Sequence, residues 1–124
     1  MKDKEAKMTD VNIAAVMAVV DEARSVARGA AQKYFQEKLG GVDRFACGFA
    51  WVDVYGVKGS TKLGKALIAA GFRKGYGKGA GLQLWDPSQF PCQNVDTLEA
   101  GAVAAAQVIS AKLGVKAYAG SRLD

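Results

Sequence analysis

The sequence predicts an α+β fold, a small mixed β-sheet packed with helices, built as a single domain over residues 1–124. Helical periodicities alternate along the chain with short runs of aromatic and β-branched residues, in the order helix, strand, helix, strand, helix, strand. Half of the residues are hydrophobic, which is enough to build one core and argues against intrinsic disorder. We expect disorder only over residues 1–8, which are mostly charged.

The first predicted helix is long. Thr9 or Asp10 caps it, small and apolar residues recur at steps of three and four, and it runs to about Leu39, where Gly40 ends it. At about 1.5 Å per residue such a helix measures about 45 Å, more than a core of this size requires. We therefore expect part of it to pack against another copy of the chain, with a kink at Gly29 as the alternative.

The middle of the chain predicts two strands around a short helix. Residues 45–55 form the first strand, in which Trp51 shares one face with the other odd positions and Asp53 lies near the strand end or in a polar pocket. Ser60 caps a helix over residues 60–70. The second strand is expected over residues 80–85.

The last third predicts a helix and a final strand. Two prolines make residues 86–91 an irregular loop, and a capping box beginning at Asp96 starts an alanine-rich helix that ends at about Leu113. The final strand is expected over residues 115–119, and residues 120–124 form the tail.

Composition favours binding over catalysis. The net charge of +5 favours an anionic partner, and the chain has no histidine, so it lacks the commonest general base and metal ligand. No carboxylates are spaced as a metal or acid–base pair. Cys47 and Cys92 lack the spacing of metal ligands and are expected to be free cytosolic thiols. We expect no enzyme activity, metal or cofactor.

Residues 71–85, the glycine-basic stretch, hold five glycines, three cations and three aromatic residues. Glycines let the backbone approach a ligand closely. Arg73 and Lys74 can hold phosphates together with Lys78, while Phe72, Tyr76 and Trp85 offer flat faces to a base. A basic surface hairpin with turn glycines is an equally weighted alternative. The stretch is neither a Walker loop nor a dinucleotide fingerprint.

Other candidate residues have structural alternatives. Asn94 can read a base edge beside Trp85 or only stabilise a turn. Arg122 can close a site as a mobile clamp or belong to a frayed tail. Arg24 and Arg28, four residues apart on the first helix, form either a solvated basic face or, in an oligomer, a ring of guanidiniums for a polyanion.

Three segments carry a resemblance: residues 84–87 (Leu-Trp-Asp-Pro), 94–101 (Asn-Val-Asp-Thr-Leu-Glu-Ala-Gly) and 118–122 (Tyr-Ala-Gly-Ser-Arg). With them the chain resembles the anti-Thoeris sponge proteins of bacteriophages, which also include anti-CBASS members. The resemblance implies a protein that sequesters cyclic nucleotide immune messengers intact, in the cytoplasm of the infected bacterial host. It also implies a homo-oligomer, either a dimer or a hexamer.

The resemblance also implies site residues. A cyclic ADP-ribose isomer would bind between two protomers through an aromatic on adenine, an asparagine and arginines at the phosphates, and the matches by type and order are Trp85, Asn94, Arg73 or Lys74, and Arg122. Cyclic trinucleotides would bind where several protomers meet, through the first helix: Arg24, Ala27 and Arg28.

Two other functions stay open on the residues alone. The runner-up is a small basic phage protein that binds RNA or DNA through the same stretch. The third is an enzyme acting on a nucleotide, with Asp53, Asp86 or Glu99 as the acid or base.

Overall fold

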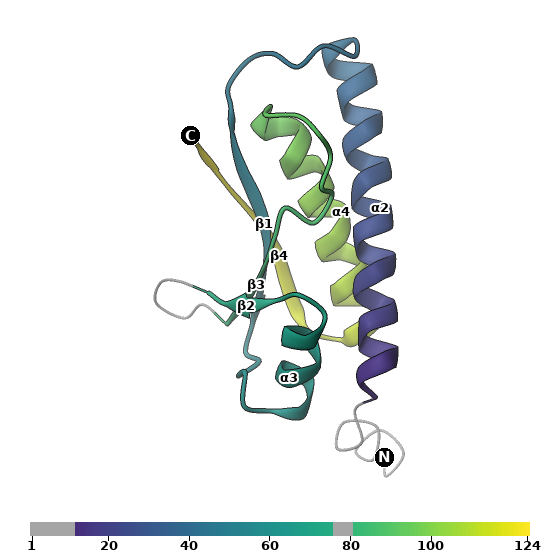
Figure 1. The fold of residues 1–124 in the computed structure, drawn as a ribbon, viewed down its shortest axis with the longest axis vertical. Coiled ribbons are helices and arrows are strands. Elements are labelled where there is room, and N and C mark those ends of the chain that lie inside the picture. Colours follow the sequence, from purple (N-terminus) through teal and green to yellow (C-terminus); the bar gives the residue numbers. More distant parts are fainter. Residues whose placement is uncertain (1–11, 76–80) are drawn as a thin grey trace.

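A computed structural model describes residues 12–75 and 81–124 of the chain (Figure 1). The predicted α+β fold is confirmed. The elements in chain order are α2 (Ile13–Leu39), β1 (Gly48–Tyr55), α3 (Lys62–Ala69), β2 (Arg73–Lys74), β3 (Leu82–Trp85), α4 (Val95–Leu113) and β4 (Lys116–Leu123). The expected disorder of residues 1–8, the helix caps proposed at residues 9 and 10, and two candidate ligand contacts, Tyr76 and Lys78, lie outside the described residues.

The four strands form one sheet in the order β2-β3-β1-β4, and every neighbouring pair is antiparallel. The prediction of a mixed sheet is therefore wrong. The reason is the strand order. β1 and β2, joined through α3, run parallel to each other, and so do β3 and β4, joined through α4. However, β3 lies between β1 and β2, and β1 lies between β3 and β4, so each strand has only antiparallel neighbours. Crossovers therefore join strands that are never neighbours.

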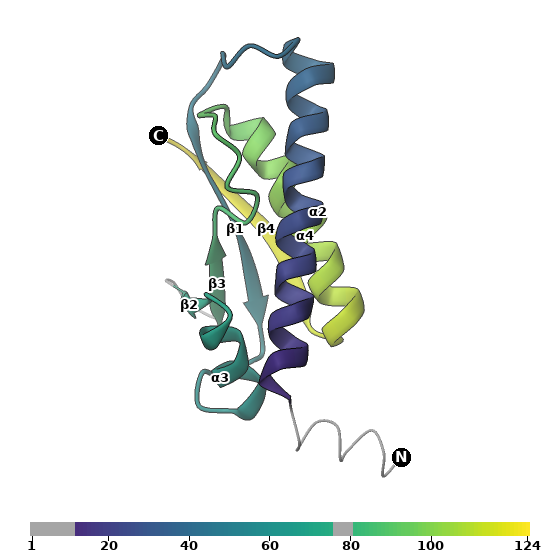
Figure 2. The ribbon, with the colours of Figure 1, turned by 45° about the vertical axis from the view of Figure 1, so that its right-hand side comes forward.

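The helices pack on one side of this sheet, and among the described residues no helix covers the other side (Figures 1 and 2). Burial alternates along β1, where Val52 and Val54 are fully buried between more exposed neighbours. These valines share the core with Val20 of α2, Leu67 of α3 and Ile109 of α4. The sheet thus has one face in the core and one face that we call the open face.

The long helix lies along α4 for much of its length (Figure 2). Small residues make the close approach feasible: a Cβ added at Gly101 of α4 would lie 3.0 Å from the Ala27 carbonyl oxygen. The helix continues through Gly29 with no break, so the proposed kink is wrong. Much of α2 is therefore used within the chain, and its packing on another copy stays a prediction.

The caps of α3 and α4 differ from the expected ones by one and two residues. Asn12 caps α2, and its side chain accepts hydrogen bonds from the N–H groups of Ala14 and Ala15. Thr61, rather than Ser60, caps α3. The cap of α4 is Asn94 and not Asp96, which lies in the first turn of the helix.

Two strand ends, which lie side by side in the sheet, also differ from the prediction. β1 begins at Gly48, because Phe45 has a left-handed φ of 67° that interrupts a strand. β4 runs to Leu123, which pairs with Gly48, so the expected tail is in fact strand. The backbone partner supplied by β1 outweighs the low strand propensity of glycine and serine in this segment.

Candidate functional site

The open face combines aromatic and basic side chains from all four strands. Residues directly opposite each other in a sheet share a face, and so do alternate residues along one strand. The register that pairs Trp51 with Trp85 therefore defines which residues lie on the open face. Its members are Phe49, Trp51, Asp53 and Tyr55 of β1, Arg73 of β2, Gln83 and Trp85 of β3, and Lys116, Tyr118, Gly120 and Arg122 of β4.

Three aromatic side chains cluster at the centre of this face. The ring centroids of Trp51 and Trp85 are 4.9 Å apart with their planes 35° from parallel, and Phe49 meets Trp85 edge-on at 6.4 Å. The two tryptophans are the only ones in the chain. Both are partly exposed. We call these three side chains the aromatic platform.

A glycine gives the platform its shape. Gly120 of β4 pairs with Trp51, and a Cβ added at Gly120 would lie 2.4 Å from the indole Nε1 and 2.9 Å from Cζ2. The indole of Trp51 therefore packs directly on the backbone of β4, in space that any side chain at position 120 would take. A glycine inside a strand commonly marks such a close approach.

A carboxylate fixes the orientation of the platform. The Trp51 Nε1–H donates to Asp53 Oδ2 at 3.0 Å, and the Gln83 Nε2–H donates to Asp53 Oδ1 at 2.8 Å. The charge of Asp53, with burial and a hydrogen bond, raises the pKa of the neighbouring Tyr55, so this phenol stays neutral at physiological pH. Gln83 Oε1 is buried and has no hydrogen-bond partner in the part of the chain that the structure describes.

Two arginines flank the platform. The Arg122 guanidinium lies 5.6 Å from the centre of the Phe49 ring, and the exposed Arg73 stands opposite Gln83 in the register. Within residues 12–75 and 81–124 the salt bridges are Arg24–Asp21 and Lys112–Glu22. Neither flanking arginine is neutralised by a carboxylate there, so both can accept an anionic group.

The structure thus brings three of the five residues expected at the ADP-ribose-type site onto one face: Trp85, Arg73 and Arg122. Lys74 is not among them, since it pairs with Leu82, whose side chain is in the core. Of the two cations between which the sequence could not choose, Arg73 is the one on the open face.

Asn94 is also absent from this face, because it is the N-cap of α4 and only 1% exposed. Its Oδ1 accepts from the backbone N–H and the hydroxyl of Thr97, both at 2.8 Å, and its Nδ2 donates to the Arg44 carbonyl at 2.9 Å. The contacts of Asn94 therefore agree with its interpretation as a structural turn residue.

The arginines of α2 lie on the helical side of the sheet and hold loops in place. Arg24 donates to the carbonyl of Ala70 at 2.9 Å, and Arg28 donates to those of Ser88 at 3.3 Å and Gln89 at 3.0 Å. Ala27, between them, is fully buried in the core. Each guanidinium therefore already has acceptors within the chain.

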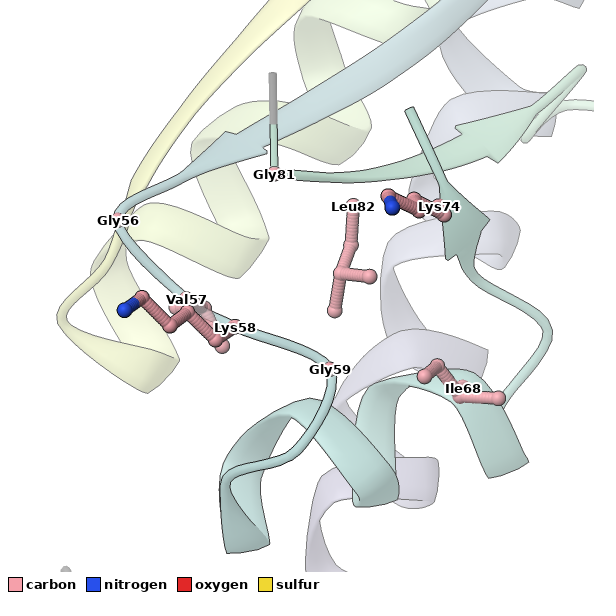
Figure 3. Close-up of a pocket in the computed structure, with 8 residues that line it drawn as sticks. All are labelled: Gly56, Val57, Lys58, Gly59, Ile68, Lys74, Gly81 and Leu82. Atoms are coloured by element: carbon pink, nitrogen blue, oxygen red, sulfur yellow. The ribbon is translucent and has the colours of Figure 1, made fainter. Parts of the chain in front are cut away.

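A separate hollow of about 620 Å³ lies at the edge of the molecule beside α3 (Figure 3). Its lining residues are Gly56, Val57, Lys58, Gly59, Ile68, Lys74, Gly81 and Leu82. Lys74 offers an amine beside the apolar Leu82, whereas the Lys58 amine points away from both (Figure 3), and no aromatic ring of the described residues lines the hollow to stack on a base. The open face, which offers both cations and aromatic rings, is the stronger candidate for a nucleotide site.

The described residues supply little for covalent or metal chemistry. They contain no cluster of three or more potential metal ligands. Cys47 and Cys92 are free, and burial raises the pKa of the Cys92 thiol, which lowers its thiolate fraction at neutral pH.

The sequence interpretation did not propose Phe49, Trp51 or Gln83 as site residues, and it considered Asp53 only as an acid or base of the alternative enzyme. The alternation along residues 45–55 did place Trp51 and Asp53 on one face, and a glycine at position 120 within a strand would have signalled a close contact. What was missing was the register, which joins β1 to strands about 30 and 70 residues further along the chain.

Comparison with known proteins identifies no family: no family model, curated protein or solved structure matches the chain. No helix among the described residues is long and apolar enough to cross a membrane. The functional argument therefore depends on the geometry of the open face.

Proposed function

We propose that this protein binds cyclic nucleotide second messengers, cyclic ADP-ribose isomers first among them, and sequesters them without cleaving them. The supporting observation is the aromatic platform of Phe49, Trp51 and Trp85, flanked by Arg122 and Arg73 on a face that no described helix covers.

The two halves of such a ligand match the two kinds of side chain. Stacking of a base on an indole contributes about 1–3 kcal/mol to the free energy of binding. The Trp51 indole needs no reorientation to receive the base, because its hydrogen bond to Asp53 already fixes it. Phosphates of the same ligand can reach the guanidiniums at the rim, which grip phosphate through two parallel hydrogen bonds. Sequestration requires no nucleophile or general base.

A second copy of the chain would enclose the ligand. Exposed apolar side chains such as Tyr118 and Phe49 lie on the open face, so a homodimer or larger homo-oligomer that covers it would exclude water from the bound base. A role in phage immune evasion, in the cytoplasm of the bacterial host, belongs to the proposal through the resemblance. A cyclic trinucleotide site at Arg24 and Arg28 has less support, because both already bond to backbone carbonyls.

The test is calorimetric titration with cyclic ADP-ribose isomers and cyclic triadenylate at physiological salt, followed by heat release and mass analysis of the ligand. We expect saturable binding and release of intact ligand. Native mass spectrometry of the complex gives the ligands bound per oligomer. Cleaved ligand would replace the proposal with an enzyme, and absence of binding to every messenger would reject it.

A second candidate is single-stranded nucleic acid, which the partly exposed aromatic rings of the open face favour, since successive bases stack on exposed aromatic side chains. Salt dependence separates the two. Affinity for a nucleic acid falls steeply with salt as counterions are released, whereas binding of a small enclosed ligand changes far less. Titrations with a ten-residue oligodeoxythymidylate at two salt concentrations make the comparison.

A further inference from the structure

We propose that Gln83 makes the open face selective for bases that carry an exocyclic amino group. This inference rests on the proposed function, since it concerns the same site. It assigns to Gln83 the choice between an amino group and an oxo group at the edge of the stacked base.

The starting observation is an unsatisfied acceptor. Gln83 lies on the open face and is 7% exposed, and its Oε1 is buried without a hydrogen-bond partner among residues 12–75 and 81–124. A buried acceptor without a donor costs about 1–3 kcal/mol. An N–H group brought by a ligand would recover that cost.

Asp53 determines which end of the amide is left without a partner. An ionised carboxylate only accepts hydrogen bonds, so the Gln83 amide must turn its NH₂ toward Asp53 Oδ1, at 2.8 Å. The opposite orientation would place two oxygens against each other. The other carboxylate oxygen, Asp53 Oδ2, accepts a hydrogen bond from Trp51 Nε1–H at 3.0 Å, so Asp53 connects the Gln83 amide to the aromatic platform. Gln83 Oε1 is consequently fixed as an acceptor.

The acceptor lies beside the platform. Gln83 is two residues before Trp85 on the same face of β3, a separation of about 7 Å, and is paired across the sheet with Asp53, two residues after Trp51. A base stacked on the indoles therefore presents an edge toward the Gln83 side chain, and because Gln83 Oε1 is covered in this structure, the contact requires a neighbouring side chain to move aside. The amino groups of adenine, cytosine and guanine can donate there, whereas an oxo group would oppose oxygen to oxygen.

A matched ligand pair tests this directly: cyclic ADP-ribose and cyclic inosine diphosphate ribose. The second ligand has an oxo group in place of the exocyclic nitrogen at C6 of the base. Its ring N1 is bonded to ribose, so that edge of the base offers no N–H. We expect the wild-type protein to bind cyclic ADP-ribose about 10- to 100-fold more tightly.

The variant Gln83→Met removes the acceptor at similar volume, and we expect its preference to fall to about equal affinities. The control is Gln107→Met, on the exposed side of α4, which should keep the wild-type preference. Thermal unfolding of each variant establishes that it is folded. Should Gln83→Met not fold, the ligand pair on the wild-type protein still decides.

Equal affinity of the wild-type protein for the two ligands would overturn this inference and leave the proposed function standing. A preference that persists in Gln83→Met would do the same, because another group would then read the base. Binding of neither these ligands nor any other cyclic nucleotide would overturn the proposed function together with the inference.

Discussion

Arginines stand on both sides of the sheet, and their surroundings differ. On the helical side, Arg24 and Arg28 donate to backbone carbonyls of the loops that follow α3 and β3. On the open face, Arg122 stacks over Phe49, and Arg73 is exposed opposite Gln83. On the helical side the two guanidiniums are engaged by backbone carbonyls. On the open face neither guanidinium has a backbone acceptor or a carboxylate partner among the described residues, so of these four arginines Arg73 and Arg122 are the ones available to a ligand.

Aromatic residues follow the same division. On the helical side Phe72 is buried in the core, and Phe35 meets Phe90 edge-on at 5.2 Å. On the open face the two tryptophans keep part of their surface in water although they contact each other. Exposed indole surface costs stability and is unusual without a partner, so it marks the face where we expect binding.

The largest expected effect is on the platform itself. Trp51→Ala removes the indole that Asp53 and Gly120 hold in place, and we expect a loss of about 1–3 kcal/mol in the free energy of binding cyclic ADP-ribose. Trp51→Phe, which keeps a ring but not the hydrogen bond, should lose less. Calorimetry measures both. An unchanged affinity in Trp51→Ala would remove Trp51 from the site.

A smaller loss is expected when the platform is displaced. Gly120→Val places a branched side chain where the indole of Trp51 now lies, so we expect weaker binding and a free energy of unfolding lower by about 1–3 kcal/mol. Lys116→Val, on the same strand and the same face, is the control and should affect neither by as much. Wild-type stability and affinity in Gly120→Val would contradict the described position of the indole.

The contrast between the arginines predicts opposite effects of one substitution. Arg28→Ala removes donors from two carbonyls and should lower the free energy of unfolding by about 1 kcal/mol, with affinity for cyclic ADP-ribose unchanged. Arg122→Ala should weaken binding and leave stability within about 0.5 kcal/mol. Chemical denaturation and calorimetry on the same two variants compare them. The reverse pattern would move the ligand to the helical side.

The smallest effect is a pH dependence on the helical side. Burial raises the pKa of Asp86, against the smaller opposing effects of the Gln89 N–H and of Arg28. The folded state therefore holds this proton more tightly than the unfolded state. The stability contributed is complete below the unfolded pKa of about 3.9 and is lost as pH rises through the raised folded value.

Asp86→Asn removes that titration. Its stability relative to the wild-type protein should therefore increase between about pH 4 and neutrality, and then stay level. Thermal unfolding at several pH values gives the difference. A difference between the two proteins that does not change with pH would show that Asp86 is not held protonated by the fold.

The parts of the fold that depend on local sequence were predictable. Periodicity located the three described helices, and the helix ends at Gly40 and Gly114 were placed correctly, because a glycine in the left-handed conformation is itself the stop signal. Strand order was not predictable, since it depends on which strands are inserted between others. Residues 120–123 read as a tail because their pairing partner is about 70 residues away.

The candidate site divides in the same way. Trp85 was found because it stands inside a stretch of distinctive local composition, whereas its partner Trp51 comes from another strand. The role of Arg28 could not be read from helix spacing, because its acceptors lie about 60 residues away in the chain. Asn94 was weighed equally as ligand contact and turn residue, and only its bonds to Thr97 and Arg44 separate the two.

The most direct measurement is intrinsic tryptophan fluorescence during titration with cyclic ADP-ribose. The only tryptophans in the chain are Trp51 and Trp85, and both lie on the open face, so the signal reports on the proposed site. We predict saturable quenching as the base stacks, with the same dissociation constant as calorimetry gives. Calorimetric binding that leaves the tryptophan emission unchanged would place the ligand elsewhere and contradict the account.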